Sequence, residues 1–219
     1  MQNAATASGR PKPQLLAVSK TQPAEAVAGL AEQGQRAFGE NYVQEAAAKQ
    51  DELALHDLPG PALEWHLIGH LQSNKAREAA ARFDWVQTVD RERLALALAR
   101  HRATERPPLN VLIQVNIDNE DSKHGCRPDE VAGLASLIAT QARLHLRGLM
   151  VIPTPHADVE ARRPAFRRTA ELFETLRIAH PYVDTLSMGM SDDLEVAIAE
   201  GATMVRVGTA LFGARTPKV

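Results

Sequence analysis

The chain has 219 residues, of which 44% are hydrophobic, enough for one domain of ordinary α/β size with a sizeable core. Its 25 basic and 27 acidic residues give a net charge of -2 and no broad basic surface, which argues against nucleic acid or anionic lipid as a partner. The sequence shows no signal peptide and no apolar run that could span a membrane, and its single cysteine, Cys126, cannot form an internal disulfide. We therefore expect a cytoplasmic protein of one domain.

The first predicted strand ends in a lysine. Residues 1–13 are rich in Ala, Ser, Gly and Pro, and we expect them to be loose until the strand begins at Gln14. The apolar run that follows predicts a buried strand ending at Lys20, and Pro23 opens a helix. Because α/β proteins bind ligands at the carboxyl ends of their strands, Lys20 is a candidate for chemistry.

Strand and helix alternate through the rest of the chain. Gly39 is predicted to make a tight turn after the second strand, which places Glu40 and Asn41 at the same edge as Lys20. Eight strands in all, with no GxGxxG run after any of them, favour a single closed (β/α)8 barrel over residues 14–219 rather than an open doubly wound sheet. The later strands are predicted at 36–38, 64–70, 84–89, 111–117, 144–152, 183–189 and 203–208.

Two loops near the end of the chain carry groups that suit a phosphate. Residues 187–191 supply two hydroxyls and a flexible glycine before a helix, and Gly208 and Thr209 supply an open backbone and a third hydroxyl. Arg206 lies in a strand that otherwise looks buried, so its guanidinium needs a carboxylate or a ligand atom as partner. A phosphorylated aldehyde held by Lys20 as a Schiff base would use all these features, and pyridoxal 5'-phosphate (PLP) is such a ligand.

Seven runs of sequence, spread from Leu15 to Arg215, carry a resemblance to a known family: LLAVSKTQP, FGENYVQE, WHLIGHLQSNK, VNIDNEDSKHGC, LRGLMVIP, LSMGMSDDLEVAI and MVRVGTALFGAR. The chain resembles the YggS/PROSC family of PLP homeostasis proteins. The resemblance implies a TIM-type barrel similar to the N-terminal domain of alanine racemase. Members of the family usually have a longer first helix, so the resemblance also implies that the N-terminal helix is missing or truncated here.

The resemblance assigns roles to individual residues. Lys20 corresponds to the Schiff-base lysine, and Arg206 to the partner of the pyridine nitrogen. The other cofactor-binding positions that it implies are Ser191, Gly208 and Thr209 at the phosphate, Asn41 at the ring, and His66, Ser187 and Met188 near the site. It further implies a monomer that buffers, stores or delivers PLP without substantial catalysis, with related B6 vitamers and PLP-dependent apoenzymes as candidate partners.

Two other functions stay open, a weak PLP-dependent amino-acid racemase and a Schiff-base phosphosugar aldolase. An arginine opposite the pyridine nitrogen disfavours racemisation, because it keeps the ring a poor electron sink. No metal site is predicted, since His66 and His70 have the zinc spacing of a helix but lie in a predicted strand. Lys123 and His124, in a long polar loop, are expected to reach the ligand if that loop folds over the barrel mouth.

Overall fold

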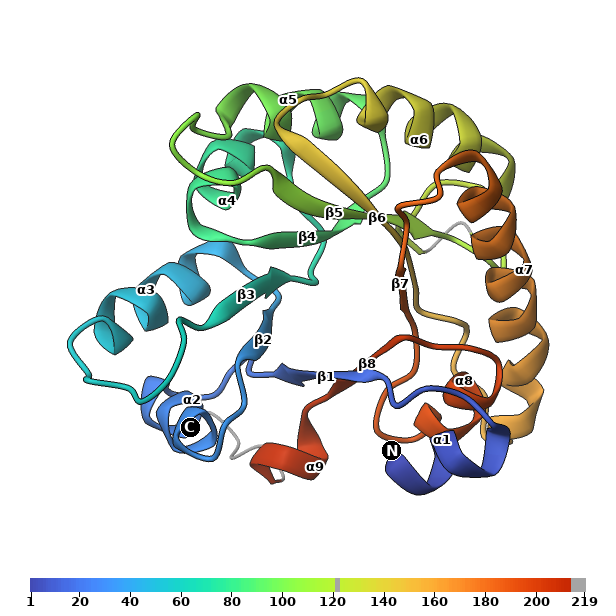
Figure 1. Cartoon of the computed structure of the whole chain (residues 1–219), viewed down its shortest axis with the longest axis horizontal. Helices are drawn as coiled ribbons and strands as arrows, with labels where there is room; N and C mark the ends of the chain where they lie inside the picture. The colour runs from blue at the N-terminus through green and yellow to red at the C-terminus, as the bar shows by residue number, and fades with distance from the viewer. Residues whose placement is uncertain (121–122, 214–219) are drawn as a thin grey trace.

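Parallel strands pair in sequence order and close into a barrel in the computed structural model, which describes residues 1–120 and 123–213 (Figure 1). The last strand pairs back with the first, so the predicted (β/α)8 barrel is confirmed. The strands are β1 (Gln14–Val18), β2 (Ala37–Glu40), β3 (Glu64–Leu67), β4 (Trp85–Val89), β5 (Leu109–Val115), β6 (Leu144–Val151), β7 (Thr185–Ser187) and β8 (Met204–Val207).

Helices surround the barrel and cover the outer face of its sheet (Figure 1). Helix α5 shows why, since Leu94 and Leu98 recur at helical spacing and are fully buried in the main core. No helix in the described part of the chain is both long and apolar enough to cross a membrane. The helices are α1 (Gln2–Ser8), α2 (Ala24–Glu32), α3 (Val43–Leu53), α4 (Ala76–Arg82), α5 (Glu92–His101), α6 (Val131–Ala139), α7 (Arg163–Ala179), α8 (Leu194–Ala199) and α9 (Thr209–Phe212).

Buried side chains occupy the barrel interior. Apolar residues form two small clusters that are separate from the main core, Leu16 with Ala37 and Met204, and Trp85 with Leu112 and Met150. The polar side chains of His66, Gln87 and Ser187 are also buried there. This layered filling is the ordinary construction of a (β/α)8 barrel, in which function is confined to the rims.

The predicted turn at Gly39 is wrong, because strand β2 continues through Gly39 to Glu40. A side chain at position 39 would stand 3.1 Å from Ile68 and 3.2 Å from Leu16, so the glycine makes room for neighbouring side chains. Glu40 is consequently fully buried. Glu40 and Asn41 were both predicted at the edge beside Lys20. Only Asn41 lines the cavity at the rim, since Glu40 is the last residue of β2.

The N-terminal segment is also more ordered than predicted. Within residues 1–13, expected to be loose, Gln2–Ser8 forms helix α1, which buries Ala5 and packs against α8 (Figure 1). Gly9, with φ 65°, ends the helix in the left-handed conformation that glycine favours. Of the two alternatives that the resemblance implied, a missing or a truncated N-terminal helix, the structure agrees with the second, since α1 is short, with seven residues.

Gly148 offers a test of how tightly the barrel strands approach each other. A Cβ atom at this position, where φ is 151°, would lie 1.8 Å from the carbonyl oxygen of Thr185 in β7. We expect Gly148→Ala to lower the free energy of unfolding by about 2–4 kcal/mol, because β6 and β7 must separate. Urea denaturation measures this loss.

The matched control is Gly133→Ala, an exposed position in α6 where an added Cβ meets nothing within 4 Å. This change is expected to stabilise the protein by about 0.5–1 kcal/mol through helix propensity. Equal effects of the two substitutions would contradict the account of β6 and β7.

Candidate functional site

A cavity of about 350 Å³ lies at the carboxyl rim of the barrel and collects most of the predicted site residues. Its lining comes from the ends of β1, β2, β3, β6, β7 and β8. Six of the nine predicted cofactor-binding residues line it, namely Lys20, Asn41, Ser191, Arg206, Gly208 and Thr209. The remaining lining residues were not predicted: Val18, Gln22, Ile68, Ile152, Met190, Asp192 and Gly213.

Several of the unpredicted residues give the cavity apolar walls. Ile152 and Met190 are each 37% exposed, unusually open for large hydrophobic side chains, and both face the cavity together with Ile68. A flat ring placed between them would cover this apolar surface. Ile68 and Ile152 directly follow β3 and β6, so the rule that strand ends line the mouth of a barrel could have found them.

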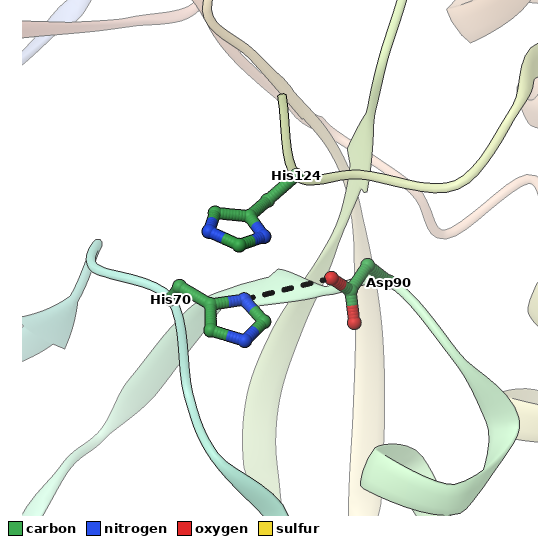
Figure 2. Close-up of side chains that lie close together, drawn as sticks. All are labelled: His70, Asp90 and His124. Atoms are coloured by element: carbon green, nitrogen blue, oxygen red, sulfur yellow. Dashed lines mark ion pairs between the residues drawn. The ribbon is translucent and has the colours of Figure 1, made fainter. Parts of the chain in front are cut away.

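The loop after β5 makes contacts other than those predicted for it. Lys123 pairs with Glu120 at 3.4 Å and donates a hydrogen bond to Thr154 Oγ1 at 3.0 Å. The ring of His124 stacks on that of His70 with 3.8 Å between centroids (Figure 2). Both side chains therefore lie at the rim, engaged with neighbouring loops.

Lys20 directly follows β1 and its side chain is half-buried at the cavity. The next residue, Thr21, has φ 66°, a left-handed conformation that is strained for a β-branched residue. Its backbone N–H donates to Glu45 Oε1 at 2.5 Å, which holds the strained turn in place. Backbone strain of this kind is commonly found at functional sites, which agrees with a functional role for the neighbouring lysine.

A buried network holds the other side of Lys20. The ammonium of Lys49, which is 6% exposed, donates to the carbonyl of Ser19 at 2.7 Å, to Glu40 Oε1 at 2.7 Å and to Glu45 Oε1 at 2.9 Å. Ser19 Oγ donates to the same Glu40 oxygen at 2.6 Å. Burial raises the pKa of Glu40, although the hydrogen bonds from Lys49 and Ser19 oppose that shift. The residues on both sides of Lys20 are thus tied to α3.

Arg206 brings a buried guanidinium to the cavity. Nη1 donates to the carbonyl and to Oγ of Ser187, each at 2.8 Å, and Nη2 donates to the carbonyl of Val151 at 2.8 Å. All of these acceptors are neutral oxygens. Burial lowers the pKa of Arg206 to about 10, so the group stays charged at neutral pH.

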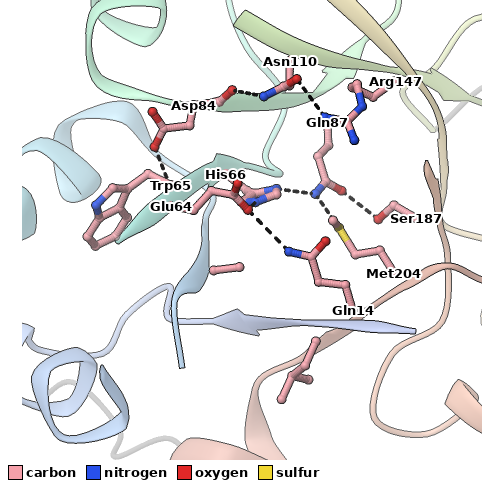
Figure 3. Close-up of polar contacts among 12 residues, drawn as sticks. Gln14, Glu64, Trp65, His66, Asp84, Gln87, Asn110, Arg147, Ser187 and Met204 are labelled. Carbon is pink, nitrogen blue, oxygen red and sulfur yellow. Dashed lines mark hydrogen bonds and ion pairs between the residues drawn. The ribbon is translucent and has the colours of Figure 1, made fainter. Parts of the chain in front are cut away.

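A chain of polar side chains that includes Ser187, Gln87 and His66 runs through the barrel interior (Figure 3). Ser187 Oγ, the acceptor from Arg206, donates to Gln87 Oε1 at 2.7 Å, and Gln87 Nε2 lies 2.9 Å from His66 Nδ1. His66 Nε2 lies 2.8 Å from Glu64 Oε1. Since the amide nitrogen of Gln87 is a donor, His66 Nδ1 accepts and Nε2–H donates to Glu64.

The remaining predicted site residues, His66, Ser187 and Met188, do not line the cavity. His66 and Ser187 are fully buried in the polar chain, and His66 stacks on Trp85 at 5.0 Å. Met188 is fully buried in the main core. The structure therefore places His66 and Ser187 where they position Arg206, through hydrogen bonds that a linear sequence pattern does not reveal.

The two predicted phosphate loops meet at the cavity as Ser191 and Gly208–Thr209. Asp193, 2% exposed, fastens the first loop by accepting from Met190 N at 2.7 Å and from Arg162 Nη1 at 2.7 Å. In the second, Gly208 precedes α9, whose first amide groups lack intrahelical acceptors as at any helix start. Hydroxyls and amides of this kind suit an anion.

Asn41 is held at the rim by an unusually close backbone contact. A Cβ atom at Gly69 would stand 2.1 Å from the carbonyl oxygen of Asn41, so only glycine fits after β3 at this point. This approach brings the loops after β2 and β3 together beside Lys20.

The barrel, with a lysine, an arginine and hydroxyl-bearing loops at its carboxyl rim, belongs to the class of the alanine racemase N-terminal domain. The family model described as alanine racemase, N-terminal domain, matches residues 1–216. The solved alanine racemase of Corynebacterium glutamicum shares this fold, with a TM-score of 0.66 and 20% identity over 95% of this chain and 57% of that chain.

More similar relatives narrow the class. The pyridoxal phosphate homeostasis protein of Escherichia coli is 52% identical over 97% of this chain and 91% of its own length, and that of Pseudomonas aeruginosa is 53% identical over 98% and 91%. PipY of Synechococcus elongatus, solved with PLP bound, superposes with a TM-score of 0.82 and 38% identity over 97% of this chain and 98% of that chain. The chain belongs to the family of pyridoxal phosphate homeostasis proteins.

The buried ion pair beneath Lys20 gives a first test of the site. Lys49→Met leaves the Glu40 carboxylate buried without its cation, and we expect a loss of about 3–5 kcal/mol in the free energy of unfolding. Glu40→Gln combined with Lys49→Met removes the stranded charge and is expected to recover most of that loss. Urea denaturation of both variants checks this, and a double variant as unstable as the single one would contradict it.

The buried imidazole gives a pH test. Burial lowers the pKa of His66 and outweighs the hydrogen bond to Glu64, which raises it. The unfolded chain therefore binds more protons, so stability present above about pH 6.5 is lost as the pH falls below that value. We expect the slope of unfolding free energy against pH, measured from pH 7 to 5, to become shallower in His66→Gln. An unchanged slope in His66→Gln would refute the assignment.

Proposed function

We propose that this protein binds PLP through a Schiff base on Lys20 and maintains the supply of that cofactor by buffering, storing or delivering it. The observation that carries the proposal is the gathering of Lys20, Arg206 and both phosphate-type loops around one cavity. Relatives at about half identity bear the name pyridoxal phosphate homeostasis protein. The bound PLP in PipY, 38% identical, supports the same ligand.

The residues present fit the parts of the cofactor. Lys20 would hold the cofactor through its amine, which would add to the aldehyde carbon while the aldehyde oxygen leaves as water. Ser191, Thr209 and the first amides of α9 offer hydrogen bonds to the phosphate, while Ile68 and Ile152 cover the ring. A cavity of about 350 Å³ falls in the range of small-molecule sites.

Arg206 would determine how the cofactor behaves once bound. When bound, PLP supplies an electron sink, and its strength depends on protonation of the pyridine nitrogen. A buried, charged guanidinium next to that nitrogen would disfavour the protonated form. Hydrogen bonds through Ser187, Gln87 and His66 hold the guanidinium in place.

The cavity lining supports a carrier more than an enzyme. Among the described residues that line it, the titratable side chains are Lys20, Asp192 and Arg206. A racemase needs a second base across the substrate, and the arginine is protonated too firmly for that role. We therefore propose that catalysis by this protein is weak at most.

The cell compartment, the oligomeric state and the partners of the protein follow from the same role. We propose that the protein acts as a cytoplasmic monomer, exchanging PLP and related B6 vitamers and passing the cofactor to PLP-dependent apoenzymes. The near-neutral charge balance and the single buried cysteine support this setting.

Borohydride reduction followed by mass mapping tests the assignment of Lys20. The purified protein with PLP is expected to show visible Schiff-base absorbance and, after reduction, to carry the modification on Lys20. Lys20→Ala should lose both signals, whereas Lys12→Ala, a change at an exposed lysine outside the cavity, should keep them. A colourless wild-type protein, or a coloured Lys20→Ala variant, would overturn the proposal.

Amino-acid turnover separates a carrier from an enzyme. We expect racemisation of amino acids by the loaded protein to proceed no faster than with the same concentration of free PLP. Turnover well above that rate, lost in Lys20→Ala, would identify a racemase instead.

A further inference from the structure

Three side chains with metal-binding atoms meet at the carboxyl rim, outside the lining of the Lys20 cavity. His70, Asp90 and His124 come from the loops after β3, β4 and β5, and Figure 2 shows the two imidazoles lying against each other beside the carboxylate. One ligand atom from each residue lies within 4.8 Å of the others, and His70 Nδ1 is 3.8 Å from Asp90 Oδ2.

Hydrogen bonds hold the segments that carry these side chains. Thr88 Oγ1 donates to the carbonyl of Gly69, the residue before His70, at 2.9 Å. The carbonyl of His124 accepts from Gln114 Nε2 at 3.3 Å, and Cys126 N donates to the carbonyl of Gln114 at 2.9 Å. The segment that carries His124, in the loop between β5 and β6, is therefore anchored to strand β5.

The carboxylate of Asp90 is oriented as well. Its Oδ1 accepts a hydrogen bond from Arg91, which leaves Oδ2 facing His70. The Asp90 side chain is 10% exposed and that of His70 is 32% exposed, so the cluster is open to solvent on the histidine side. An ion could enter from that side and keep a water molecule in a further coordination position.

We propose that His70, Asp90 and His124 form a binding site for a divalent transition-metal ion such as Zn²⁺. Two imidazole nitrogens and one carboxylate oxygen are a donor set that zinc takes in proteins. Ligand atoms about 2.0–2.2 Å from a tetrahedral ion lie about 3.4 Å apart. The three ligand atoms already lie within 4.8 Å of one another, so the rings of His70 and His124 must turn out of their stacked arrangement to close the site around an ion.

The site would tie three loops of the barrel mouth together next to the cofactor cavity. His70 also lines a neighbouring cavity of about 420 Å³ together with Asn41, which in turn lines the cavity at Lys20. Gly69 directly precedes His70 and packs against the backbone of Asn41. A bound ion would consequently restrain the rim on the side of Asn41.

Isothermal titration of the purified full-length protein with ZnCl₂, after dialysis against a chelator, tests the proposal. We expect one equivalent to bind to the wild type at pH 7.5. His124→Ala should weaken binding at least about tenfold, and His70→Ala with His124→Ala should abolish it. The control His56→Ala, an exposed histidine outside the cluster, should bind as the wild type does.

Thermal unfolding gives a second readout. With free Zn²⁺ at about 100 times Kd, the wild-type Tm should rise by about 5–10 °C, and the double variant should show no rise. The same one-equivalent binding in Lys20→Ala would show that the ion does not sit on the cofactor. Absence of stoichiometric binding to the wild type, unchanged binding in the double variant, or loss of binding in Lys20→Ala would overturn the proposal.

Discussion

The pairing of β1 with β8 is the constraint on which the site depends. In this register Leu16 stands beside Arg206 and Ala17 beside Val207, so the chain just after β1 meets the chain just after β8 (Figure 1). Lys20 and Gly208–Thr209 are thereby brought to one rim from opposite ends of the sequence. A slip of one residue would turn Arg206 from the barrel interior to the outer core, because side chains alternate along a strand. Closure of the barrel therefore creates the site as well as completing the sheet.

Two polar networks then hold the residues that closure brings together. One ties the backbone around Lys20 to α3 through Glu40, Lys49 and Glu45, and the other supports Arg206 through the barrel interior. Buried ion pairs add little net stability over apolar packing of the same volume. Their value here is geometric, since each network ends at a group that faces the cavity. The barrel contributes apolar packing elsewhere, which offsets the cost of these buried polar groups.

Most of the fold could be predicted from the sequence because the strands and most of the helices have local sequence patterns. Apolar runs such as Leu15–Val18 and helical repeats such as Leu94 and Leu98 need no knowledge of distant residues. The cavity was predictable in part, since Lys20 and Gly208–Thr209 follow strands. Glu40 and Lys49 were not, because a buried charge is recognised only by its partner across the fold, and a mid-helix lysine looks like any solvated one. Helix α1 was not predicted for a related reason. Its apolar face is short, and its role becomes evident only where it packs against α8.

The cavity has apolar walls, and polar side chains support the guanidinium of Arg206 next to it. This arrangement favours binding of a ring over catalysis with it. Covering the exposed side chains of Ile152 and Met190 would remove apolar surface from water, which would stabilise a bound ring whatever amino acid follows. Catalysis instead requires groups whose interactions strengthen only in the transition state, such as a proton donor and acceptor on opposite faces of a substrate. Under the proposed function, the charged guanidinium of Arg206 would act in the opposite sense, since it would lower the capacity of the ring to accept electrons. A site that covers the ring and weakens its reactivity would suit a protein that holds a reactive aldehyde.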